Sequence, residues 1–129
     1  MSEWRNGEII WQDLTVENAE AIRDFYCDVI GFTWEGEDMG GYEDYHMIPP
    51  KGEQGVTGVC HARGINANVP PQWLTYFTVE DAVLAAARTE QAGGKVLDGP
   101  RPMGGGTFVV IQDPAGAVCA LIDNKPITD

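Results

Sequence analysis

Two stretches of the chain show the same order of apolar and polar segments, and each predicts a strand that runs into a helix. Residues 9–15 and 73–79 are rich in β-branched and aromatic side chains, which are typical of strands. An acidic or amide pair follows each of them, Glu17-Asn18 and Glu80-Asp81, and such residues cap helices at their N-termini. The pattern therefore places a strand and a helix at the start of each half.

The two predicted helices differ in their side chains. The first ends at Gly31, which supplies a left-handed stop, whereas the second ends at Gly93-Gly94. Small residues from Ala82 to Ala87 build the second helix and allow it to approach a sheet closely. The first helix carries a single apolar stripe at spacings of three to four residues, formed by Ala21, Ile22, Phe25, Tyr26, Val29 and Ile30.

Three strand-like segments follow each helix, separated by turn residues. The turn Asp113-Pro114-Ala115-Gly116 joins the last two of the second half. Both halves thus read as strand, helix and three strands. The predicted strands cover roughly residues 32–37, 42–48 and 56–62 in the first half and 95–97, 107–112 and 117–122 in the second.

An internal repeat supports two related halves. Thr15-Val16-Glu17 returns as Thr78-Val79-Glu80, an offset of 63 residues that also places Trp11 on Leu74. We expect an α+β fold, a single domain of residues 1–129 built from two βαβββ modules whose strands form a curved mixed sheet. The modules are expected at 7–63 and 72–123, with a linker at 64–71 and a tail at 124–129.

Charge narrows the choice of partners. The 129 residues carry 20 acidic and 8 basic side chains, a formal charge of −12, which argues against a nucleic-acid groove or a basic membrane-binding patch. Residues 1–53 hold 13 of the acidic and 3 of the basic residues. The three cysteines are widely spaced and lack a CxxC motif, and no apolar segment has the length of a signal peptide. We expect a cytoplasmic protein with reduced thiols.

Several motifs together resemble the vicinal oxygen chelate superfamily, which includes glyoxalases, bleomycin-resistance proteins and extradiol dioxygenases. They are Trp11-x-Asp13-Leu14-x-Val16, Phe25-Tyr26, Gly31-Phe32, the run from Pro70 to Val79, and Asp113-Pro114-x-Gly116 before a last apolar strand. The resemblance covers residues 7–123. It implies that the curved sheets of two βαβββ modules form a cup for a small-molecule ligand, and that a second chain often completes it. The exposed sheet edges of a chain this small favour a homodimer.

Metal-dependent members of this family hold a divalent ion on His, Glu or Gln side chains of the first and last strands of the modules. Carried over by position, these sites fall on Trp11, Leu74 and Ala120, none of which offers a ligand atom. The fourth site falls on the strand at 56–62, among small and apolar residues that end in Cys60 and His61. We therefore expect neither a metal nor another cofactor.

Polar residues near the predicted cup are candidates for ligand contact. Cys60 and His61 are neighbours in a strand and point to opposite faces, which argues against a Cys-His nucleophile pair. Either Cys60 is a buried small residue and His61 a partly exposed polar one, or one of the two, Cys60 or His61, is a polar contact with Arg63 at the mouth of the cup. The loop at 99–106, with three consecutive glycines, either folds over the opening, with Arg101 and Met103 as contacts, or is a plain turn.

Asp13 and Tyr76 share the inward side of their strands with Trp11 and Leu74. A carboxylate there is costly unless it is paired, so Asp13 is either bonded to Tyr76 or Arg63 as a structural group or kept for a ligand. A raised pKa would let Asp13 move a proton at carbon beside a carbonyl.

Three functions fit this sequence. The first is metal-independent binding of a compact organic ligand around Trp11, Leu74, Tyr76 and Ala120. The second is a glyoxalase-like lyase or isomerase that uses Asp13, Tyr76 or His61, or a metal-dependent member whose ligands are unrecognised. The third is an interaction protein whose dimer interface matters more than its pocket.

Overall fold

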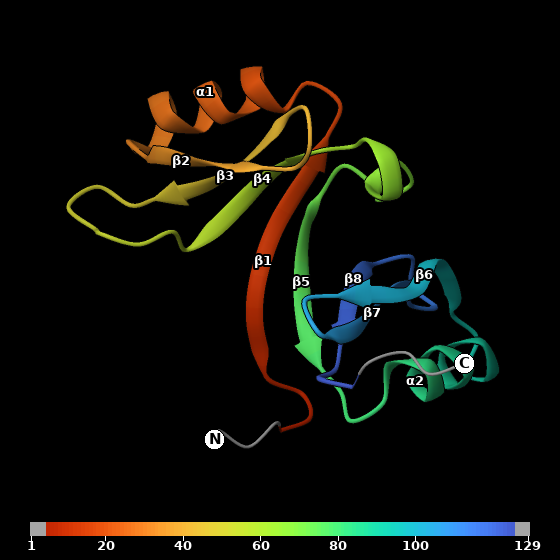
Figure 1. Cartoon of the computed structure of the whole chain (residues 1–129). Helices are drawn as coiled ribbons and strands as arrows, with labels where there is room; N and C mark the ends of the chain where they lie inside the picture. The colour runs from red at the N-terminus through yellow and green to blue at the C-terminus, as the bar shows by residue number, and fades with distance from the viewer. Residues whose placement is uncertain (1–4, 126–129) are drawn as a thin grey trace. The chain divides into compact units, whose positions relative to one another are not determined.

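Each half of the chain folds as a strand, a helix and three strands, as the sequence predicts (Figure 1). The computed structural model describes residues 5–125, so residues 126–129 of the expected tail lie outside the described residues. Within 5–125, no helix is long and apolar enough to cross a membrane. The described part of the chain divides into a first unit, Trp11–Trp73, and a second unit formed by residues 5–10 and 74–125.

The first unit contains a four-stranded sheet in the order β2-β3-β4-β1, with α1 over one face (Figure 1). The strand β1 pairs in parallel with β4, whereas the pairs β2·β3 and β3·β4 are antiparallel. Ala19, Tyr45, Met47 and Val59 form the core between helix and sheet. The elements are β1 Ile9–Val16, α1 Ala19–Ile30, β2 Thr33–Asp38, β3 Glu43–Ile48 and β4 Thr57–His61.

The helix α1 ends where the sequence predicts. Gly31 has a φ of 92°, and its backbone N–H donates to the Cys27 carbonyl. A residue with a Cβ is strained in this left-handed conformation, whereas glycine adopts it freely. Gly31 therefore stops the helix and turns the chain into β2.

The second unit repeats this arrangement with the strand order β5-β8-β7-β6, and β5 is parallel to β8. Ala82 and Ala86 of α2 pack against Val109, which confirms the close approach predicted from the small side chains of this helix. A short 3₁₀ helix, η1, at Gly64–Asn66 precedes this unit within the linker segment. The elements are β5 Trp73–Thr78, α2 Ala82–Gln91, β6 Lys95–Met103, β7 Gly106–Gln112 and β8 Val118–Ile122.

A buried carboxylate ties the second unit together. Asp123, 2% exposed, accepts hydrogen bonds from the backbone N–H groups of Ala82 at 2.6 Å, Thr107 at 2.9 Å and Lys125 at 2.9 Å. These donors belong to the start of α2, to β7 and to the segment after β8. Three backbone bonds compensate the cost of burying this charge.

The structure corrects one expected segment. The strand β6 runs to Met103, well beyond the expected 95–97, so the glycine-rich segment does not form a loop over an opening. Gly104 and Gly105, both with positive φ, make only the turn into β7. A Cβ on Gly99 would lie 2.8 Å from the Phe108 carbonyl oxygen, so this glycine permits a close approach between β6 and β7 at a break in their register.

The two helix starts give a matched test of capping. Asp81 accepts a hydrogen bond from the Leu84 backbone N–H at 3.0 Å, whereas the Asn18 side chain makes no capping bond. We expect Asp81→Ala to lower the free energy of unfolding by about 1 kcal/mol and Asn18→Ala to lower it by less than about 0.5 kcal/mol. Urea denaturation of both variants measures this difference, and equal losses would contradict it.

Candidate functional site

The face of the first sheet that lies opposite α1 gathers several of the predicted site residues. Leu14 and Val16 alternate along β1 with Trp11 and Asp13, and Val16 packs toward the α1 core. The parallel pairing places Asp13 opposite Gly58 of β4. We call this surface the α1-distal face; it comprises Trp11, Asp13, His46, Gly58 and Cys60.

Trp11 and Asp13 interact directly. The indole Nε1–H of Trp11 donates to Oδ2 of Asp13 at 3.3 Å, and the Trp11 ring meets His46 edge-on with centroids 6.3 Å apart. His46 in turn places Nε2 2.8 Å from a carboxylate oxygen of Glu37. The indole nitrogen thus acts as a donor. Asp13 is half-buried as a residue, and its Oδ1 atom is buried.

Gly58 leaves space between two functional side chains. A Cβ at this position would lie 3.3 Å from the Cβ of Asp13 and 3.6 Å from the Sγ of Cys60. A Cβ would therefore crowd Asp13 and be in ordinary van der Waals contact with Cys60, so glycine leaves space beside both side chains on the α1-distal face.

The Cys60 thiol is held in its neutral form. Burial raises the pKa of Cys60 well above its ordinary value, and the nearby charges of Asp13 and Asp44 and a hydrogen bond to Asp44 raise it further. A protonated thiol is a poor nucleophile.

His61 and Arg63 lie around a residue that sequence reasoning missed, Asp44. The backbone N–H of His61 donates to Oδ1 of Asp44 at 2.8 Å, and the His61 Nδ1 is 3.4 Å from the same oxygen. The guanidinium of Arg63 lies over the ring of Tyr42, 4.0 Å from its centroid. Nothing in the sequence marks Asp44 among the 13 acidic residues of 1–53.

The second unit holds the other predicted contacts. Leu74, Tyr76 and Ala120 are buried, and Tyr76 stands opposite Ala120 in the β5·β8 pairing. The Tyr76 ring stacks on Phe108, with centroids 5.7 Å apart.

Arg101 contacts the Phe108 ring, and Met103 lies at the end of the same strand. The Arg101 guanidinium lies 4.5 Å from the Phe108 ring centroid and pairs with Asp98 at 3.0 Å. Met103 pairs with Gly106 at the end of the β6·β7 hairpin. Arg101 is therefore neutralised by its own strand.

The residues at the family's metal positions do not fit a divalent ion. Trp11 uses its only ring nitrogen as a donor, and Leu74 and Ala120 carry no donor atoms for a cation. Across residues 5–125, no three His, Cys, Asp or Glu side chains gather closely enough to hold a metal.

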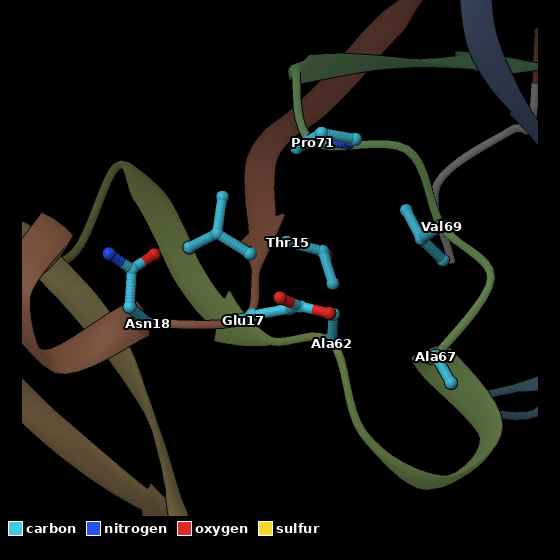
Figure 2. A pocket seen from close by; sticks show the side chains of 8 residues that line it. Thr15, Glu17, Asn18, Ala62, Ala67, Val69 and Pro71 are labelled. Carbon is cyan, nitrogen blue, oxygen red and sulfur yellow. The ribbon is translucent and has the colours of Figure 1, made fainter.

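Three cavities open within the first unit, and none is lined by the predicted site residues. One of about 310 Å³ lies at the ends of β1 and β4 (Figure 2). Glu17 and Asn18 line it from the start of α1, and Ala67, Val69 and Pro71 line it from the linker, as Figure 2 shows.

The other two cavities, of about 450 and 370 Å³, share Tyr26 and Trp73. The Trp73 Nε1–H donates to the Tyr26 hydroxyl at 3.0 Å, so the two aromatic side chains are fixed against each other. Tyr26 and Trp73 both belong to motifs that carry the family resemblance, so their place in these motifs was the feature of the sequence that could have pointed to the two cavities.

Comparison with known proteins gives a family match over most of the chain. The model of the Glyoxalase/Bleomycin resistance protein/Dioxygenase superfamily matches residues 8–121. The glyoxylase-like protein CFP32 of Mycobacterium bovis is 30% identical over 121 residues, 93% of this chain and 45% of its own length. The anthracycline biosynthesis protein DnrV of Streptomyces peucetius is 29% identical over 133 residues, 94% of this chain and 48% of its own length. The chain thus spans about half the length of these relatives.

Solved structures show the same fold at low identity. A methylmalonyl-CoA epimerase of Streptomyces coelicolor, in complex with 2-nitronate-propionyl-CoA, has a TM-score of 0.52 at 17% identity and covers 92% of this chain and 98% of its own. The Mn(II)-bound glyoxalase of Novosphingobium aromaticivorans has a TM-score of 0.54 at 20% identity and covers 98% of this chain and 43% of its own.

The raised pKa of Cys60 predicts a loss of stability at alkaline pH. Above about pH 8.5, the thiol of the unfolded chain ionises whereas the folded Cys60 keeps its proton, so the free energy of unfolding falls by up to about 1.4 kcal/mol per pH unit. Urea denaturation at several pH values should show this fall in the wild type and a shallower fall in Cys60→Ala. Parallel curves for the wild type and Cys60→Ala would refute the assignment.

Proposed function

Because the chain belongs to the glyoxalase/bleomycin resistance protein/dioxygenase superfamily, we propose that it binds a compact organic ligand without a metal ion. The observation that carries this proposal is the Trp11–Asp13 hydrogen bond at the family's first metal position. An indole nitrogen that donates its proton offers no lone pair to a cation. A ligand there must be held by other forces.

The α1-distal face offers those forces. The indole ring of Trp11 presents an apolar surface, the carboxylate of Asp13 accepts hydrogen bonds, and Gly58 leaves room between Asp13 and Cys60. This combination suits a ligand with a flat or apolar body and a hydroxyl or amide donor. The neutral Cys60 thiol adds a soft, uncharged neighbour.

The relatives support a small organic ligand in general terms. Their names describe a glyoxylase, a protein of anthracycline biosynthesis and a methylmalonyl-CoA epimerase. Each of these names refers to a small organic molecule. We extend only the ligand class to this chain, because it spans about half of the curated relatives and the fold neighbours are distant in sequence.

A ligand screen with a matched pair of variants tests this proposal. In buffer with EDTA, at least one compact metabolite should raise the melting temperature of the wild type in a saturable way. Asp13→Asn should weaken its binding roughly tenfold or more, because a charged acceptor is lost. Asp28→Asn, the same charge change on the exposed side of α1, should leave binding unchanged.

The outcomes separate the candidate functions. A ligand that binds only when a divalent metal is added, or binds equally well to Asp13→Asn, would overturn the proposal. If the protein converts the ligand into a product under the same conditions, its function is that of a lyase or isomerase and not ligand binding alone.

A further inference from the structure

His61 at the end of β4 is anchored from one side by a buried carboxylate. Asp44 of β3 is 5% exposed, and its Oδ1 accepts from the His61 backbone N–H at 2.8 Å and faces the ring Nδ1 at 3.4 Å. The Cys60 thiol also bonds to this carboxylate. A carboxylate that receives donors from two consecutive residues of β4 fixes the orientation of the His61 ring.

This orientation favours one tautomer of the neutral imidazole, the one in which Nδ1 donates to the carboxylate. A proton on Nδ1 faces Asp44, which leaves Nε2 with a lone pair. Among residues 5–125 no hydrogen bond reaches Nε2, and 12% of the His61 side chain is exposed. Nε2 of His61 is therefore a hydrogen-bond acceptor without a partner among the described residues.

Arg63 supplies a cation beside this acceptor. Its backbone is extended, with φ of −135° and ψ of 158°, so its side chain follows the same side of the chain as that of His61. The Tyr42 ring contacts both, with the Arg63 guanidinium 4.0 Å and the His61 ring 5.4 Å from its centroid. Both groups thus pack against the same aromatic ring.

The charge of Arg63 is not neutralised within the described part of the chain. Arg23 pairs with Asp24 and Arg101 pairs with Asp98, whereas no carboxylate within residues 5–125 pairs with Arg63. This is notable because residues 1–53 hold 13 acidic side chains and would offer partners. An anionic ligand would complete the site.

We propose that His61 and Arg63 form a binding site for a small hydroxy acid. The guanidinium of Arg63 pairs with the carboxylate, the hydroxyl donates to Nε2 of His61, and Asp44 is the positioning residue that faces Nδ1 and orients the ring. The site uses neither Trp11 nor Asp13, so it goes beyond the ligand proposed for the α1-distal face and stands or falls independently of it.

The first test reads the tautomer directly. In ¹⁵N NMR spectra of the neutral imidazole, Nδ1 of His61 should carry the proton and Nε2 should not, and Asp44→Asn should change this pattern while the amide spectrum stays folded. A wild-type ring protonated at Nε2 would overturn the proposal without any ligand.

The second test uses three small probes. Glycolate should shift the His61 and Arg63 side-chain resonances saturably at millimolar concentration. Acetate lacks the hydroxyl and should bind about fivefold more weakly, and glycolamide lacks the charge and should bind roughly tenfold more weakly or worse.

A pair of arginine variants completes the test. Arg63→Gln should weaken glycolate binding roughly tenfold, whereas Arg88→Gln, which removes an exposed cation from α2, should leave it unchanged. The proposal is wrong if glycolate leaves His61 unshifted, if acetate binds as well as glycolate, or if Arg63→Gln binds as the wild type does.

Discussion

The parallel pairing of the first and last strand of each module is the constraint on which the site depends. In the first unit, β1 lies beside β4 with Asp13 opposite Gly58 and Thr15 opposite Cys60, and the Ala62 N–H extends the ladder to the Val16 carbonyl. A parallel pair requires a long crossover, which α1, β2 and β3 provide. This register alone decides that Trp11, Asp13 and Cys60 share a face, and a shift by one residue would exchange them with the α1 core.

The same register places candidate ligand-binding side chains on two surfaces of the first unit. On the α1-distal face, an indole that donates its proton to Asp13 stands where metal-dependent relatives would need a ligand atom. At the end of β4, the carboxylate of Asp44 fixes His61 beside Arg63. Burial and the neighbouring carboxylates raise the pKa of Cys60, the thiol that lies on the first of these surfaces. The groups that remain on the two surfaces are hydrogen-bonding side chains and aromatic rings.

The sequence was sufficient to predict turns and helix ends, which depend on neighbouring residues. It was not sufficient to predict contacts between strands that are far apart in the sequence. Gly31 and the Asp113–Gly116 turn were predicted because their backbone conformations require those residues. The length of β6 was underestimated, because Gly99 was taken as a mark of a loop whereas it serves a close approach to Phe108. Asp44 was missed because it meets His61 across 17 residues, through a strand register that no local pattern reveals.

The central claim, that this member of the superfamily recognises its ligand without a metal, is tested most directly by elemental analysis of the purified protein. Samples incubated with Mn²⁺, Ni²⁺, Zn²⁺ or Co²⁺ and then passed through a desalting column should retain far less than one ion per chain, since Trp11 offers no lone pair. Two results together would contradict the account: the protein retains one equivalent of any of these ions, and EDTA removes both the ion and the ability to bind ligand.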